Sequence, residues 1–286
     1  MKLKTFPIGL STCGNKPLDE KSLLAMKASG IDYLELSNAD YETFDFEEIC
    51  STAQKCGIKI WSLHLPFTPF DKLDPSSPDP AIRSYTMEFM QALITRAAKA
   101  GIDKFVIHPS IEPIDDSIRE AKLNAATSFL SELADFAAGY GAVIAVENLP
   151  RTCLGKNSSE ILRLLSANDK LRVCFDTNHL LSEEITAFIQ NVGDKIITTH
   201  ISDYDFINER HWLPGEGKVD WNAVFAALQK INYSGVWMYE IGFAPEKSIR
   251  RRMLTCDDFV ENARSIFAGQ KPAAVGTPVE NLGFWA

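Results

Sequence analysis

The segment from Asp103 to Glu147 decides the fold class. It contains two apolar, β-branched runs, Asp103-Lys-Phe-Val-Ile-His108 and Ala142-Val-Ile-Ala-Val-Glu147, separated by an amphipathic helical pattern at 116–140. Gly141 follows the helical pattern, and glycine is the usual left-handed cap of a helix. A strand–helix–strand order of this kind predicts two parallel strands joined by a right-handed crossover.

The same alternation occurs eight times, which predicts an α/β protein with a closed (β/α)8 TIM barrel. Strands are expected at 6–11, 31–36, 58–64, 103–108, 142–147, 171–176, 195–200 and 235–240. Helices are expected at 19–29, 46–56, 80–100, 116–140, 157–167, 182–192, 220–230 and 246–268. An open doubly wound sheet would usually carry a phosphate loop after its first strand, and Gly9-Leu-Ser-Thr-Cys-Gly14 fits neither GxGxxG nor a P-loop.

Composition and charge describe a globular protein with a complete core and argue against a nucleic-acid partner. The chain has 286 residues, of which 45% are hydrophobic and 23% charged. Its formal net charge of -9 disfavours a broad phosphate-binding surface, because non-specific DNA affinity depends on Lys and Arg. The net charge does not exclude a locally basic cleft.

Cysteine usage and hydropathy indicate the compartment. The 6 cysteines form no CxxC pair and no metal-finger spacing, so we interpret them as buried thiols in a reducing compartment. The basic start at Met1 precedes an apolar run that is too short for a signal peptide. No segment approaches the ~20 apolar residues that span a membrane. We expect a cytoplasmic protein with no membrane partner.

We expect a single domain followed by a short tail. Residues 1–268 show no internal boundary and are assigned to the barrel. Residues 269–286 are punctuated by Pro and Gly and end in Leu282-Gly-Phe-Trp-Ala286. Two interpretations of this aromatic end stay open: it packs on the barrel or a neighbouring subunit, or it is disordered.

The candidates for function are the residues at the carboxyl ends of the strands, where a barrel of this class carries its active site. All 5 histidines lie at a strand end or just beyond one: His64, His108, His179, His200 and His211. Three carboxylates end strands on the same rim: Glu147, Asp176 and Glu240. One histidine after a strand is usually a satisfied loop residue, but an unpaired carboxylate ending an apolar strand is costly to bury. Together these residues favour a metal site.

Three oxygen ligands and one imidazole form the expected metal-binding set: Glu147, Asp176, His200 and Glu240. Such a set suits one divalent ion, Mn²⁺, Mg²⁺, Co²⁺ or Zn²⁺, and the sequence does not choose among them.

Four motifs on successive strands resemble the xylose isomerase-like barrel superfamily, over about residues 5–268. They are Glu147-Asn-Leu-Pro, Asp176-Thr-Asn-His179, His200-Ile-Ser-Asp203, and Arg210-His-Trp-Leu-Pro-Gly-Glu-Gly217 followed by Asp220-Trp221. The superfamily includes sugar-phosphate isomerases and epimerases, ketose 3-epimerases and the endonuclease IV group. The resemblance to the ketose epimerases implies one metal at the four ligands above. It also implies proton exchange by Glu147 and Glu240, and substrate contacts by His179 and Arg210.

The resemblance to endonuclease IV implies that further zinc ions are possible. His64 and His108 match the extra ligands of one zinc, which shares Glu147. The third zinc is matched by His179, Glu209 and His211, with Glu209 where that family has Asp. The loops after the sixth and seventh strands look shorter than in the endonuclease, so DNA-gripping elements are expected to be missing. Members that act on sugars retain the same histidines, which therefore do not prove three metals.

The leading hypothesis is a divalent-metal-dependent isomerase or epimerase that acts on a small sugar or sugar phosphate through an enediolate. Glu147 and Glu240 are expected to be catalytic, and the expected substrate-binding residues are His64, His108, His179, Arg210 and His211. The alternatives are a multi-zinc phosphodiesterase of the endonuclease IV type, a keto-sugar dehydratase and a non-catalytic sugar-binding barrel. A homo-oligomer is left open, since members of the superfamily are often dimers or tetramers.

Several rim residues have two interpretations. Phe67, Phe70, Trp212 and Phe243 are candidates for the apolar wall of a sugar site, or they pack within the fold. Arg151 and Lys156 follow the fifth strand and either meet an anionic substrate or lie on the solvated surface.

Overall fold

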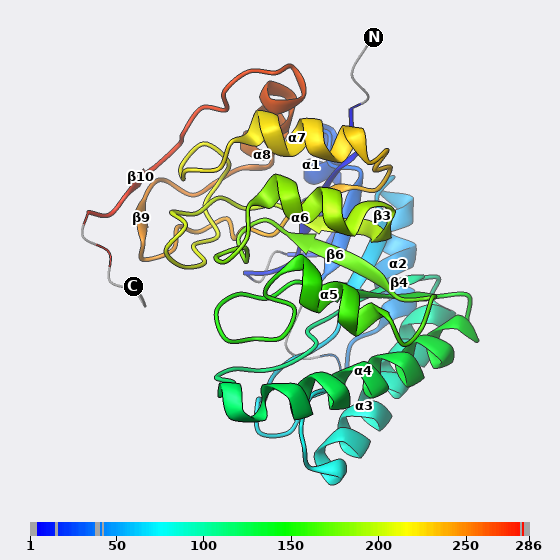
Figure 1. Cartoon of the computed structure of the whole chain (residues 1–286). Helices are drawn as coiled ribbons and strands as arrows, with labels where there is room; N and C mark the ends of the chain where they lie inside the picture. The colour runs from blue at the N-terminus through cyan, green and yellow to red at the C-terminus, as the bar shows by residue number, and fades with distance from the viewer. Residues whose placement is uncertain (1–4, 15–16, 38–40, 42, 281, 283–286) are drawn as a thin grey trace.

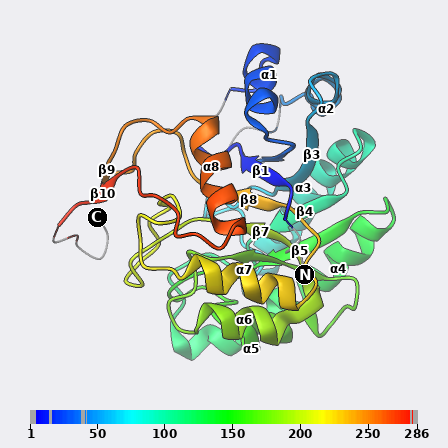
Figure 2. The same cartoon turned by 90° about the horizontal axis from the view of Figure 1, so that it is seen from above.

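Eight parallel strands form the inner layer of the molecule and eight helices form the outer layer. The computed structural model describes residues 5–14, 17–37, 41, 43–280 and 282. The strands are β1 (Ile8–Ser11), β2 (Tyr33–Leu36), β3 (Lys59–His64), β4 (Lys104–Ile107), β5 (Val143–Glu147), β6 (Arg172–Asp176), β7 (Ile196–His200) and β8 (Trp237–Tyr239). The helices are α1 (Glu20–Ser29), α2 (Phe46–Lys55), α3 (Pro80–Lys99), α4 (Asp116–Ala138), α5 (Ser158–Leu165), α6 (Ile185–Val192), α7 (Trp221–Lys230) and α8 (Cys256–Phe267). This arrangement confirms the (β/α)8 barrel (Figures 1 and 2).

The strand order is that of a barrel. Neighbours in the sheet follow β7-β6-β5-β4-β3-β2-β1-β8, and every pair is parallel. The two ends of this sheet meet where Ile201, just after β7, pairs in parallel with Tyr239 of β8. Because all eight strands run in one direction, their carboxyl ends and the loops that follow lie at one mouth of the barrel.

Local sequence explains where the helices begin and end. Side chains at the helix starts accept hydrogen bonds from backbone N–H groups of the first turn, as at Asp19, Asp45, Asp79, Asp115, Asn157, Asp220 and Thr255. The glycines after four helices have positive φ, as their sequence position predicts: Gly30, Gly57, Gly101 and Gly141. Local side-chain caps thus fix the starts of seven of the eight helices, while α6 begins without a side-chain cap.

The interior of the barrel changes from apolar to polar along the strands. Val106, Ala145 and Cys174 form a small buried cluster of their own. Side chains two positions apart on a strand point to the same side, so Glu147 follows Ala145 and Asp176 follows Cys174 along the interior face. The strand period therefore places both carboxylates inside the mouth.

The eighth helix differs from its expected range of 246–268. It begins at Cys256, because Thr255 and Asp258 form a capping box that fixes its first turn. The residues before it include a short strand, β9 (Ile249–Arg250), which pairs antiparallel with β10 (Thr277–Pro278) of the tail. The sequence predicted a helix from residue 246, but residues 249–250 pair with the tail as a strand instead.

The first part of the tail packs on the barrel. The backbone N–H of Gly276 donates to Glu216 Oε1 at 2.8 Å, and that of Val279 donates to the Ser248 carbonyl at 2.9 Å. The aromatic end expected to pack or to be disordered, 283–286, lies outside the described residues.

Two findings concern membrane helices and the cysteines. Within the described ranges, no helix is long and apolar enough to cross a membrane. No disulfide joins the cysteines, all of which are described. The prediction of buried thiols is confirmed for Cys56, Cys153 and Cys174 and is wrong for the other three, which are half-buried: Cys13, Cys50 and Cys256.

Candidate metal centre and active site

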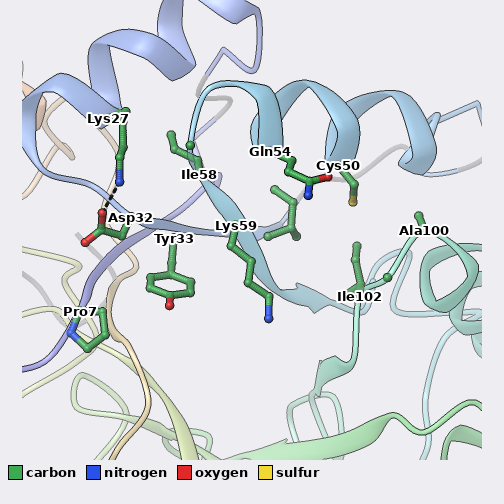
Figure 3. A pocket seen from close by; sticks show the side chains of 13 residues that line it. Pro7, Lys27, Asp32, Tyr33, Cys50, Gln54, Ile58, Lys59, Ala100 and Ile102 are labelled. Atoms are coloured by element: carbon green, nitrogen blue, oxygen red, sulfur yellow. Dashed lines mark hydrogen bonds and ion pairs between the residues drawn. The ribbon is translucent and has the colours of Figure 1, made fainter.

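Two cavities lie at opposite ends of the barrel. A cavity of 230 Å³ lies at the mouth and is lined by four histidines and by the carboxylates of Glu147, Glu209 and Glu240. A larger cavity of 740 Å³ lies at the other end, near the start of β2 and β3, where Lys27 pairs with Asp32 and Lys59 points into the opening (Figure 3). Catalytic residues of this fold lie at the mouth, and the larger cavity contains none of the candidate residues.

Glu147 is the centre of the site. It is fully buried, and its Oε2 lies 3.1 Å from His64 Nε2 and 3.3 Å from His108 Nε2. Its Oε1 lies 3.1 Å from His200 Nδ1 and 3.3 Å from His179 Nδ1. One carboxylate at the end of β5 therefore contacts imidazoles on β3 and β7 and in the loops after β4 and β6.

The four expected metal ligands come together. Glu147, Asp176, His200 and Glu240 each offer an atom, and these atoms all lie within 4.8 Å of one another. His200 Nδ1 lies 3.7 Å from Asp176 Oδ2 and 3.4 Å from Glu240 Oε2.

The hydrogen bonding of Asp176 tests whether this set fits a cation. Its Oδ1 accepts a hydrogen bond from the backbone N–H of Asn178 at 2.6 Å, whereas its Oδ2 is buried with no hydrogen-bond partner. A buried carboxylate oxygen without a partner is costly, and a divalent ion would satisfy it. The residues present therefore fit a hard or borderline divalent cation.

Three further groups of possible ligands occur among the described residues. One shares two members with the four-ligand set: Glu147, Cys174 and His200. The other two are His64–His108–Glu147 and His179–Glu209–His211. In each group the ligand atoms lie within 4.8 Å of one another. His179 Nε2 lies 3.1 Å from Glu209 Oε2. His211 has a φ of 47°, a region that residues other than glycine rarely adopt and that is often found at functional sites.

The carboxylates of the site have displaced pKa values. Burial raises the pKa of Glu240 to about 7, and the charges of Glu147 and Asp176 also raise it, against the opposing effect of His200. Burial likewise raises the pKa of Asp176 to about 6. Burial would also raise the pKa of Glu147, but His200 and His108 outweigh it and hold that pKa well below its usual range. The pKa values of Glu147 and Glu240 are thus displaced in opposite directions, as in the acid–base pairs of enzymes.

Glu35 is a member of this cluster that the sequence analysis missed. It lies on β2, is fully buried, and its Oε1 is 2.9 Å from His200 Nε2. His200 and Ser62 outweigh burial and hold the pKa of Glu35 below its ordinary value. The signal was a carboxylate inside an apolar strand, Tyr33-Leu-Glu-Leu36. The search for strand-ending residues, which found Glu147, passed over it because Leu36 follows it in the strand.

Arg210 is not among the residues that line the mouth cavity. Its backbone N–H donates to Asn178 Oδ1 at 2.8 Å, and its Nε donates to Asp205 Oδ2 at 2.9 Å. Its expected contact with substrate stays a prediction, and the geometry places its head group on Asp205. His64, His108, His179 and His211, the other expected substrate contacts, all line the cavity.

Arg151 is a cation of the cavity wall. It forms ion pairs with Glu112 and, at 2.9 Å, with Glu209 Oε1. Phe67 and Phe70 also line the cavity, and the Phe67 ring stacks on His108 with centroids 4.3 Å apart. The other rim candidates, Trp212, Phe243 and Lys156, are not part of this wall.

Fold and site together define a (β/α)8 barrel whose strand ends gather carboxylates and imidazoles around a cation-sized space. The chain belongs to the xylose isomerase-like TIM barrel family, whose model matches residues 23–255.

The chain is similar to proteins of several kinds. An uncharacterised protein of Methanocaldococcus jannaschii is 30% identical over 59% of this chain, and the match spans 60% of that relative. A ketose 3-epimerase of Arthrobacter globiformis is 26% identical, covering 77% of this chain and 76% of the relative. A probable endonuclease 4 of Acholeplasma laidlawii is 24% identical, covering 65% and 69%. Among solved structures, an L-ribulose 3-epimerase superposes with a TM-score of 0.74 at 20% identity, covering 93% of this chain and 94% of that one. This last likeness concerns the fold.

Proposed function

We propose that the protein is a divalent-metal-dependent isomerase or epimerase of a small carbohydrate, working by proton transfer next to a carbonyl. The observation that carries the proposal is the pairing of Glu147 and Glu240 in one cation-sized cluster, with pKa values displaced in opposite directions. The sugar-epimerase relative supports the same reaction class.

The two glutamates divide the proton transfer between them. An ion held by Glu147, Asp176, His200 and Glu240 would supply Lewis-acid polarisation of the substrate carbonyl. Glu147, which stays ionised, is suited to remove the proton from the adjacent carbon and so to form an enediolate. Glu240, which lies in the same cluster at the end of β8, is placed to exchange a proton with the substrate from another side.

The cavity supports a small polar substrate. Two histidines of its wall, His64 and His179, already use both ring nitrogens in contacts with the protein. His108 and His211 use one each, which makes them the better candidates to meet hydroxyl groups. Phe67 and Phe70 give the cavity an apolar side. Glu112 and Glu209 already neutralise the positive charge of Arg151. This arginine therefore does not require a phosphate group on the substrate. A cytoplasmic location and a homo-oligomer remain predictions.

Solvent exchange tests the reaction. The protein loaded with Mn²⁺ is incubated with a panel of ketoses in D₂O, and deuterium at the carbon next to the carbonyl is followed by NMR. Glu147→Gln and Glu240→Gln should each abolish exchange, while Glu261→Gln, an exposed change on α8, should not. Full exchange in either active-site variant would refute the assignment.

The second candidate is a multi-zinc phosphodiesterase. It is favoured by the groups His64–His108–Glu147 and His179–Glu209–His211, which adjoin the four-ligand set, and by the endonuclease relative. Neighbouring ions of that kind activate water and stabilise a leaving oxygen. Elemental analysis after gentle purification separates the two candidates: one metal per chain supports the epimerase, and three zinc ions with cleavage of abasic DNA support the phosphodiesterase.

A further inference from the structure

His200 lies between two carboxylates, those of Glu147 and Glu35, one at each ring nitrogen. Its Nδ1 faces the metal-binding set, 3.1 Å from Glu147 Oε1. Its Nε2 points the other way and lies 2.9 Å from Glu35 Oε1. Both His200 and Glu35 are fully buried, and Glu35 belongs to none of the groups that offer ligands to an ion.

The barrel holds Glu35 in this position from two sides. The register between β2 and β3 shifts at Leu34 and Glu35, so that Glu35 lies opposite Ser62. The Ser62 hydroxyl donates to Glu35 Oε2 at 2.8 Å, which leaves Oε1 for His200. The two carboxylate oxygens thus have one partner each, and the side chain has a defined direction across the barrel.

We propose that Glu35 is a positioning residue that sets the tautomer and the orientation of His200 for cation binding. An ionised carboxylate only accepts hydrogen bonds, so the proton of a neutral imidazole must lie on Nε2. Nδ1 then carries the lone pair and faces Glu147, Asp176 and Glu240. This proposal rests on the metal-binding part of the proposed function and not on the sugar reaction.

The ring of His200 has little freedom to choose another arrangement. It stacks on the His64 ring with centroids 5.8 Å apart and an interplanar angle of 16°. Carboxylate partners of metal-binding histidines fix ring orientation, and their loss typically weakens metal affinity by about 10- to 100-fold. A Gln at position 35 keeps the shape of the side chain but loses its charge, and its amide NH₂ would favour the opposite tautomer.

Mn²⁺ titration of the whole protein tests the proposal, with unbound Mn²⁺ measured by electron paramagnetic resonance. Glu35→Gln should weaken the affinity by about 10-fold or more, and Glu35→Ala by at least as much. Glu216→Gln is the matched control, because Glu216 is also a buried carboxylate but accepts from Arg251 and the tail. Its Mn²⁺ affinity should equal that of the wild type.

A second measurement separates positioning from a general loss of structure. In the wild type loaded with Zn²⁺, ¹⁵N NMR of the His200 ring should show the proton on Nε2, and Glu35→Gln should reduce that population. A proton on Nδ1 in the wild type would overturn the proposal. So would Mn²⁺ affinity within twofold of the wild type in a folded Glu35→Gln variant. If Glu35→Ala does not fold, Glu35→Gln decides alone; Mn²⁺ binding without any sugar turnover would refute the reaction but not the role of Glu35.

Discussion

Replacing Glu240 by Gln should make the metal-free protein more stable while it destroys the metal site. In the metal-free protein, burial and the charges of Glu147 and Asp176 disfavour ionisation of Glu240 and raise its pKa to about 7. Ionisation of Glu240 therefore destabilises the folded protein relative to the unfolded chain. A Gln side chain has nearly the same shape and never ionises, so the penalty disappears with the substitution.

The magnitude follows from the displacement of the pKa. A shift of the Glu240 pKa from its ordinary value of 4.5 to about 7 corresponds to about 3 kcal/mol of unfolding free energy. The sign is fixed by the direction of the shift: the folded-state pKa is raised, so the stabilising contribution is complete below pH 4.5 and is lost as the pH rises through 7. With an unfolding entropy of about 0.6 kcal/mol/K for 286 residues, the difference in Tm should be about 5 °C at pH 8 and about 1 °C at pH 5.

Calorimetry in the presence of EDTA measures this difference at both pH values. Addition of Mn²⁺ should then reverse the order, because the wild type gains a ligand-linked increase in Tm and Glu240→Gln gains much less. A wild type that is more stable than Glu240→Gln at pH 8 without metal would refute the reasoning. So would a difference in Tm that does not change with pH.

Three further predictions concern the same site and its support. The apparent affinity for Mn²⁺ should rise at least about tenfold between pH 6 and pH 8, since Glu240 and a protonated His200 must each lose a proton to bind, and a flat profile in titration calorimetry would contradict this. Gly217→Ala should destabilise the fold by several kcal/mol in denaturant titration, because a Cβ there would lie 2.2 Å from Asp203 Oδ1 and 2.4 Å from the Tyr204 carbonyl. Asn148→Ala should cost about 1–3 kcal/mol of stability, because the Asn148 side chain pairs with the backbone N–H and carbonyl of Asp176; an unchanged midpoint in urea would argue against that role.

The sequence by itself determined the barrel and most of its active rim. Eight alternations of strand and helix fix parallel strands, and parallel strands place their carboxyl ends together whatever the details of packing. Glu147, Asp176 and His200 end their strands and could therefore be assigned to one site before any distance was known. Local periodicity and chain direction suffice for such residues.

Only the tertiary structure decided how the remaining side chains are directed. Glu35 contacts His200 across the barrel, although 165 residues separate them in the sequence. The contact depends on a register shift between β2 and β3 that no local sequence pattern predicts. Arg210 and Arg151 have the same charge and both lie in rim loops, yet buried Asp205 holds the first, while Glu112 and Glu209 hold the second in the cavity wall. A side chain's direction depends on which partner lies nearest in space, and that partner is chosen by the closure of the barrel and not by neighbours along the chain.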